Sequence, residues 1–126
     1  MKNLKILDLN KNKIRTIPSQ IWNLPNIIYL NLANTQTTTL PVGISNLNRL
    51  ETLFLNGNFL SSLPEDIGYL KQLKELYLGF NKLTSLPTSM SNLVTLQLLD
   101  LYGNDKISFE EKERIKTLIP NCQVLE

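Results

Sequence analysis

The chain has 126 residues, with 13 Lys and Arg against 11 Asp and Glu and a formal net charge of +2. A charge this small does not by itself indicate affinity for nucleic acid or membranes, and no aromatic stacking residues lie among the early lysines. The chain lacks the apolar run of about 18 residues that a membrane-spanning helix needs. It also has no His, the commonest general base and metal ligand. We therefore expect no enzyme activity, metal, cofactor or nucleic-acid partner.

A single unit recurs almost five times: Leu-x-x-Leu-x-Leu-x-x-Asn-x-Leu-x-x-Leu-Pro-x-x-Ile-x-x-Leu-x-x, with its prolines 23 residues apart. Self-similarity at about 20 to 29 residues predicts a stacked solenoid, because one repeat cannot bury its own apolar face and needs neighbours. We expect one domain over residues 1–126. Its repeats are 4–26, 27–49, 50–72, 73–95 and 96–118, and its C-terminal cap is 108–126.

The repeat predicts a strand followed by a helical return. Its Leu-x-Leu segment alternates apolar and polar residues with period two, which indicates a short strand with one face inward. The Leu-Pro-x-x-Ile-x-x-Leu segment suits a helical or 3-10 turn that proline opens, because proline lacks an N–H. The fold class is therefore an α/β, right-handed solenoid shaped as a horseshoe or arc. A parallel sheet lines its concave side, and short helical turns lie on the convex side.

Position 9 of each repeat predicts an internal ladder of polar side chains. A buried amide there can bond backbone groups of the adjoining coil where the strand turns away, which an apolar residue could not do. The ladder residues are Asn12, Thr35, Asn58, Asn81 and Asn104. In the second repeat, Thr35, Thr37, Thr38 and Thr39 replace the usual residues, so we expect a weaker and less dry patch of core there.

The C-terminal segment predicts a cap. Ser108 and Glu111 form a capping box that opens a helix to about Leu118, and Pro120 stops it. Three further residues occupy positions 1, 4 and 6 of a last half repeat: Ile119, Cys122 and Val124. The helix and a final strand would then seal the open end of the core. The apolar position of Cys122 favours a buried structural thiol over a nucleophile.

Residues 100–111 offer an alternative, a calcium loop of the EF-hand kind. Asp100, Asn104 and Glu111 fall at ligand positions of such a loop. Tyr102 cannot supply the third-position carboxylate, and Asp105 stands where the sharp turn requires glycine. Asp100 also belongs to the fifth strand of the repeat. We therefore expect no metal site.

The motif from Leu4 to about Asn104 resembles the leucine-rich repeat family, and residues 108–122 resemble the terminal cap of 23-residue repeat proteins from pathogenic spirochaetes. The resemblance implies a protein-recognition module, including binding to a host protein, and a secreted or cell-surface location. Met1 leads directly into repeat sequence, so no signal peptide is expected in this chain. An enzyme would need an appended domain, as in bacterial leucine-rich repeat effectors with ubiquitin-ligase tails, for which the cap leaves no room.

The first repeat has no polar cap of the kind that solenoids need. Met1 to Asn3 fall where an earlier repeat would end, and Leu4 begins the first strand directly. Two alternatives follow. The chain is a fragment of a longer repeat array, or its apolar edge is covered by another molecule, as in a self-associating scaffold or homodimer. The edge residues are Leu4, Leu7, Leu9, Ile14 and Ile21.

Outward positions of the sheet predict a binding surface. They hold six of the nine aromatic residues: Tyr29, Phe54, Phe59, Tyr77, Phe80 and Tyr102. Strands about 4.8 Å apart should bring Phe54, Tyr77, Phe80 and Tyr102 into one patch of the kind that protein interfaces use. We add Asn31, Asn56 and Glu75 to this predicted partner-binding set. The alternative is that aromatic residues simply favour strands.

Overall fold

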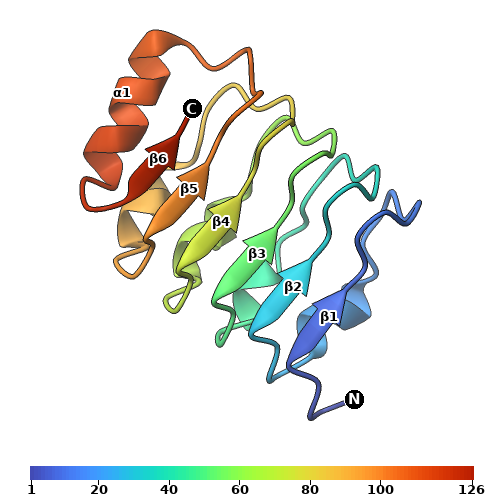
Figure 1. The fold of residues 1–126 in the computed structure, drawn as a ribbon. Helices are drawn as coiled ribbons and strands as arrows, with labels where there is room; N and C mark the ends of the chain where they lie inside the picture. The colour runs from blue at the N-terminus through green and yellow to red at the C-terminus, as the bar shows by residue number, and fades with distance from the viewer.

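Six short strands form one parallel sheet in a computed structural model that describes residues 1–126 (Figure 1). Each strand pairs with the next strand along the chain, so the sheet grows coil by coil from the N-terminal end to the C-terminal end. The strands are β1 (Ile6–Asp8), β2 (Tyr29–Asn31), β3 (Thr52–Phe54), β4 (Glu75–Tyr77), β5 (Leu98–Asp100) and β6 (Gln123–Leu125).

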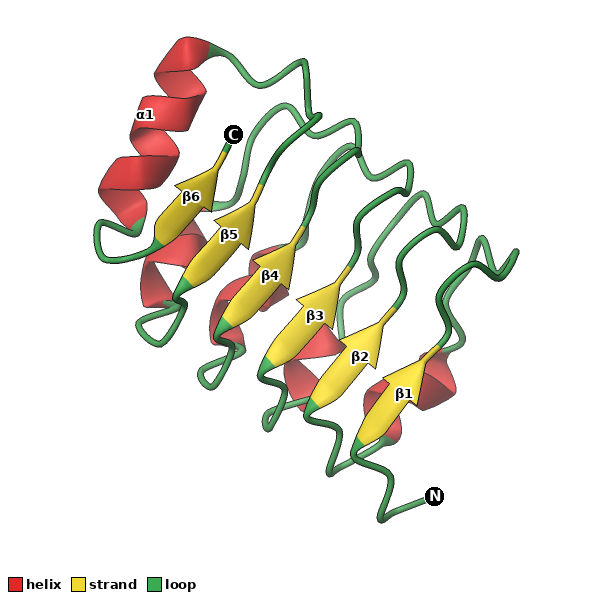
Figure 2. Ribbon diagram, viewed as in Figure 1, coloured by secondary structure: helices red, strands yellow, loops and turns green.

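Short 3-10 helices cover the opposite side of each coil (Figure 2). They are η1 (Ser19–Asn23), η2 (Ile44–Asn46), η3 (Glu65–Tyr69) and η4 (Thr88–Asn92). Proline is the N-cap residue of η1, η3 and η4, at Pro18, Pro64 and Pro87. An N–H group at this position would not form a helical hydrogen bond, so its absence in proline costs nothing. Gly43, in a left-handed conformation, precedes the shorter η2. The predicted α/β solenoid is confirmed.

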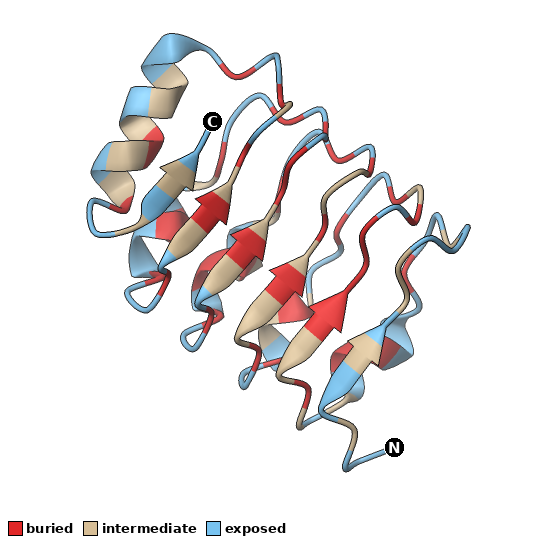
Figure 3. Ribbon diagram, viewed as in Figure 1, coloured by how far each residue is buried: buried red, intermediate tan, exposed pale blue.

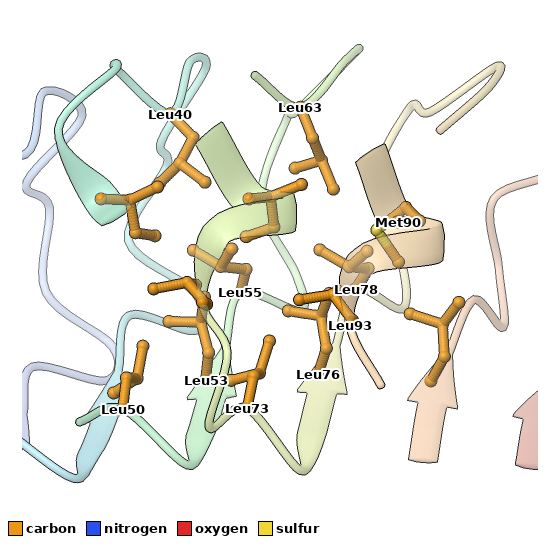
Figure 4. Close-up of a cluster of buried hydrophobic side chains, with 14 of the residues drawn as sticks. Leu40, Leu50, Leu53, Leu55, Leu63, Leu73, Leu76, Leu78, Met90 and Leu93 are labelled. Atoms are coloured by element: carbon orange, nitrogen blue, oxygen red, sulfur yellow. The ribbon is translucent and has the colours of Figure 1, made fainter. Parts of the chain in front are cut away.

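The leucines at the strand centres align across the whole sheet. Leu30 pairs with Leu53 and Leu53 with Leu76, and all three are fully buried, whereas Leu7 on the edge strand is only half-buried (Figure 3). Behind them, Leu63, Met90 and other side chains of the returning limbs complete the core (Figure 4). Each fully buried leucine stabilises the fold by about 1.5–3 kcal/mol, but only where both neighbouring coils cover it.

Buried asparagine amides tie consecutive coils together. The Asn81 Nδ2 donates to Leu78 O of its own repeat at 3.0 Å and to Leu55 O of the preceding repeat at 2.9 Å. Its Oδ1 accepts from the N–H of Leu60 at 2.9 Å. Asn58 and Asn104 bond their neighbouring coils in the same way. Each amide therefore satisfies backbone groups that have no partner within their own strand.

Threonine replaces asparagine at this position in the second repeat without leaving a hydroxyl unpaired. Thr35 and Thr37 are fully buried, and their hydroxyl oxygens lie 2.8 Å apart. Thr35 Oγ1 donates to Leu32 O at 2.8 Å, while Asn58 Oδ1 accepts from the N–H groups of both threonines at 3.0 Å. The expected polar patch is thus present, but its groups are hydrogen-bonded, which avoids the cost of burying unpaired polar atoms.

Asn12 differs from the other members of the ladder. Its side chain is exposed, and its Nδ2 donates only within its own repeat, to Leu9 O at 2.9 Å and Asn10 O at 3.3 Å. The expectation of a buried amide is therefore wrong at this position. The reason is that Asn12 lies on the edge coil, where only one side of the ladder is covered by a neighbour.

Helix α1 (Phe109–Leu118) closes the C-terminal end of the solenoid beside β6 (Figure 1). Ser108 Oγ accepts from Glu111 N–H at 3.1 Å, as the predicted capping box requires. The Glu111 carboxylate does not return to Ser108. It accepts from Leu86 N–H at 3.0 Å and pairs with Arg114 at 2.9 Å, so the first turn of α1 is fastened to the fourth repeat.

The predicted register of the last strand is wrong by two residues. Val124 pairs with Leu99, where the repeat period places Cys122. The α-helix advances only about 1.5 Å per residue, so the chain needs extra residues to return to the sheet. Cys122 is consequently half-buried beside the core, and burial raises the pKa of its thiol to about 11. At neutral pH this thiol is a poor nucleophile.

We predict that Asn81→Ala lowers the free energy of unfolding by about 1–3 kcal/mol, because the buried Leu60 N–H loses its acceptor. Urea unfolding monitored by circular dichroism measures the change. The exposed Asn46, whose side chain makes no hydrogen bond, supplies the control Asn46→Ala, which should unfold close to the unsubstituted protein. Equal losses in the two variants would contradict the role given to the ladder.

Candidate functional site

Three aromatic rings run across the outward face of the sheet. The Phe54 ring on β3 stacks on the Tyr77 ring on β4, with centroids 4.3 Å apart and ring planes within 3° of parallel. On the other side of Phe54, the Tyr29 ring of β2 lies 5.4 Å away and is tilted by 51°. All three side chains are half-buried. We call Tyr29, Phe54 and Tyr77 the aromatic ladder.

Two carboxylates border the aromatic ladder at Tyr77. The Tyr77 hydroxyl donates to Glu75 Oε1 at 2.6 Å, and the strand register places Asp100 of β5 directly beside Tyr77. The hydrogen bond to Glu75, partial burial and the negative charges of Glu75 and Asp100 together raise the pKa of Tyr77 to about 12. The charged form of Tyr77 is therefore disfavoured by the hydrogen bond to Glu75, by burial and by the two neighbouring carboxylates.

Phe80 and Tyr102 form a second aromatic group just beyond the ends of β4 and β5. Their ring centroids lie 5.5 Å apart with the planes at 73°, and the side chains are 61% and 58% exposed. They border a hollow of about 400 Å³ that reaches Lys112 of α1. Phe59 belongs to neither group, because its ring lies under Lys82, with Nζ 5.1 Å from the centroid. The aromatic residues of the predicted patch therefore form separate groups of contacting rings.

Phe80 has a backbone conformation that is unusual for a bulky residue. Its φ is +55°, in the left-handed region. The equivalent position of every repeat is left-handed, and elsewhere it is held by Lys11, Asn34, Gly57 and Gly103. A side chain on Gly103 would collide with the Phe80 ring, since its Cβ would lie 2.6 Å from a ring carbon. The unfavourable backbone conformation of Phe80 therefore occurs at a residue whose ring is exposed. Gly103 of the next coil, which has no side chain, leaves space for that ring.

Asn31, one of the predicted binding residues, is the last residue of β2 and borders the turn that follows this strand. Its side chain is buried, and its Oδ1 accepts from Ala33 N–H at 3.0 Å. Asp8 and Asp100 make the same bond to the N–H two residues on. This position thus shapes the turn after the strand, because Asx side chains readily bond to nearby backbone. Asn31 therefore stabilises this turn, and its predicted part in partner binding stays a prediction.

Asn56 and Asp100 also depart from the sequence interpretation. Asn56 is half-buried, and its Oδ1 is enclosed without a hydrogen-bond donor. Asp100 was not among the predicted binding residues, yet it lies beside Tyr77 in the register. The repeat period could have found it, since Asp100 follows Tyr77 by one period of 23 residues.

The acidic groups of the structure do not assemble into a metal site. No group of three or more His, Cys, Asp or Glu residues is placed to hold a metal ion. Within the calcium-loop alternative, Asn104 is buried in the polar ladder and Asp100 lies in β5. No helix is long and apolar enough to cross a membrane.

We predict that Tyr77 ionises near pH 12 and that Glu75→Gln moves its pKa down toward 10.0, because the substitution removes the charged acceptor. Because the unfolded chain ionises first, the contribution of Tyr77 to stability is present below pH 10 and is lost as pH rises toward 12. The ultraviolet absorbance of tyrosinate follows the titration. The late transition should vanish in Tyr77→Phe and persist in the control Glu110→Gln; its persistence in Tyr77→Phe would contradict the assignment.

A family model described as leucine-rich repeat region matches residues 1–119. No curated protein matches the chain. Among solved structures, a leucine-rich repeat protein of Leptospira interrogans is 45% identical, with a TM-score of 0.95, over 98% of this chain and 31% of that chain. An internalin C2 of Listeria monocytogenes is 27% identical, with a TM-score of 0.79, over 98% of this chain and 52% of that chain.

A third similar structure is the plant peptide hormone receptor RGFR1 in complex with RGF2. It is 37% identical, with a TM-score of 0.72, over 80% of this chain and 17% of that chain. The chain therefore spans only part of each of these relatives. The family match and the two bacterial neighbours confirm the resemblance inferred from the repeat motif and the cap. The chain belongs to the leucine-rich repeat family.

Proposed function

We propose that the chain is a non-catalytic recognition module that binds a protein ligand through the aromatic ladder on its concave face. The observation that carries the proposal is the stack of Phe54 on Tyr77 in the middle of the sheet, where packing of the core does not require aromatic rings. Aromatic side chains near the centre of a surface are the usual anchors of protein interfaces. Glu75 and Asp100 supply the polar rim beside them.

The relatives support a protein or peptide ligand. The plant relative is a peptide hormone receptor that was solved in complex with RGF2. The resemblance of the cap to that of spirochaetal pathogen proteins leads us to propose a host protein as the ligand. Phe80 and Tyr102, which are exposed at the edge of the same face, extend the proposed contact area toward α1.

We predict that Phe54→Ala combined with Tyr77→Ala leaves the fold intact and abolishes recognition of the ligand. Truncating an anchor of this kind costs about 2 kcal/mol or more in affinity. After a protein ligand has been selected from a library of extracellular proteins, titration calorimetry measures its affinity for each variant. The matched control is Tyr69→Ala with Phe109→Ala, two exposed rings away from the sheet face. Unchanged binding by the ladder variant would overturn the concave assignment.

A specific observation favours a second candidate function, self-association through the N-terminal edge. Ile6 on β1 is 64% exposed, and its neighbours Leu4, Leu7 and Leu9 are only half-buried. β1 pairs with β2 on one side, and its other edge is open. Because α1 closes the opposite end, head-to-tail fibres are blocked, and a closed two-fold dimer is the simplest cover for this edge.

We predict that the protein forms dimers whose association strengthens as salt rises. Four exposed lysines near the edge would repel their copies at low salt, and salt screens this repulsion: Lys2, Lys5, Lys11 and Lys13. Light scattering at several dilutions measures the mass. Ile6→Glu should weaken the dimer, whereas Val94→Glu, at an exposed position on another coil, should not. A monomeric mass at high protein concentration and high salt would exclude this function.

A further inference from the structure

We propose that the ligand segment lying over β4 and β5 is cationic, and that it places an arginine guanidinium against the free face of Tyr77, between Glu75 and Asp100. This inference rests on the proposed function and names the chemistry of its partner. It follows from three features of the sheet face: one open ring face, two carboxylates without a cationic partner, and a charge opposite in sign to that of the whole chain.

The open ring face belongs to Tyr77. Phe54 covers the side of the Tyr77 ring that looks toward β3, at 4.3 Å and within 3° of parallel. The other side looks across to β5, where the paired residue is Asp100. Asp100 has no ring to stack on Tyr77, and Phe54 is the ring that contacts Tyr77, so no aromatic side chain occupies this second face. A guanidinium stacks on aromatic faces, and a ring in contact with a second ring is already held in place for it.

The two carboxylates lie on either side of that space. Glu75 Oε1 accepts from the Tyr77 hydroxyl, and Asp100 Oδ1 accepts from Tyr102 N–H at 3.0 Å, which leaves one oxygen of each carboxylate for a ligand. As diagonal neighbours on adjacent parallel strands, the two residues lie about 8 Å apart at their Cα atoms. A guanidinium, with donors on both edges, is suited to bridge two such acceptors, whereas an ammonium is a compact point charge.

Neither carboxylate has a cationic partner within the chain. The ion pairs of the structure use other acids: Glu51, Glu111, Glu113 and Glu126. The Asp100 carboxylate packs over Gly79, two residues after β4, since a Cβ there would lie 3.1 Å from Asp100 Oδ2. The negative charges of Glu75 and Asp100 are thus not paired with a cation of this chain.

The charge of the sheet face is opposite to that of the chain. The outward residues of the six strands include Asp8, Glu75 and Asp100 but no Lys or Arg, although the chain as a whole carries a net charge of +2. The basic residues therefore lie elsewhere on the surface. A face of this sign attracts a cationic segment and repels an acidic one, which gives specificity as well as affinity.

The test uses the blocked peptide acetyl-Gly-Arg-Gly-amide and its citrulline analogue, which has the same shape without the charge. Nuclear magnetic resonance titration of the ¹⁵N-labelled protein should show shifts at the amides of β4 and β5 with the arginine peptide, and at least about tenfold weaker binding of the citrulline peptide. Binding of the arginine peptide should also weaken as salt rises toward roughly 0.5 M. Equal binding of the two peptides would overturn the proposal.

The variant Glu75→Gln with Asp100→Asn should bind the arginine peptide about tenfold more weakly, while its amides still accept from the Tyr77 hydroxyl and Tyr102 N–H. The control Glu65→Gln with Glu110→Gln changes the net charge equally at exposed sites away from the sheet face and should bind normally. An equal loss in the control would overturn the proposal, because it would show an effect of net charge alone.

The affinity of the two variants for the protein ligand distinguishes a failure of this inference from a failure of the proposed function. If the Phe54→Ala, Tyr77→Ala variant loses the protein ligand while the Glu75→Gln, Asp100→Asn variant keeps full affinity, recognition by the aromatic ladder stands and the cationic partner is wrong. If both variants lose it, both proposals hold. If neither variant loses it, both fail.

Discussion

Every coil of this solenoid depends on its neighbours to cover the leucines that it cannot cover itself. Leu30, Leu53 and Leu76 are fully buried because a coil lies on each side, whereas Leu7, in the same position of the edge coil, is half-buried. The asparagine ladder obeys the same constraint, since Asn81 bonds the coil before it and Asn12 bonds only its own. Stability in such a fold is therefore a sum of contacts between nearest neighbours.

The contacts between neighbouring coils also explain how the chain presents the proposed binding surface. Because the strand centres are held by leucines, the residues on either side of each centre are free to vary without disturbing the core. Phe54 and Tyr77 stand on that free face, and the fixed register between β3 and β4 brings their rings into a parallel stack. The core thus provides a rigid frame, and the ladder is positioned on strands rather than on mobile loops.

Just beyond the strands, the backbone of Phe80 has an unfavourable conformation. A left-handed conformation costs a bulky residue of order 1–3 kcal/mol, and Asn or Gly would suit the position better. The structure nevertheless holds an exposed phenylalanine there, with Gly103 of the next coil providing the space for its ring. The same position is left-handed in every repeat, so the turn of the repeat imposes this conformation, and at Phe80 it accompanies the exposed Phe80–Tyr102 pair beside the concave face.

The sequence by itself determined the architecture, because a fixed spacing of leucines and prolines allows only one repeated arrangement of strand and return. The 23-residue period located the strands β1 to β5, and the Ser108 cap located the start of α1. Only the tertiary structure decided which side chains meet. It bonded the Asn31 side chain to the backbone two residues on, separated Phe80 from the stacked rings, and placed Val124 rather than Cys122 opposite Leu99. The physical reason is that a repeat pattern specifies the average path of the chain, whereas contacts depend on the particular rotamers, turn bonds and helix rise at each coil.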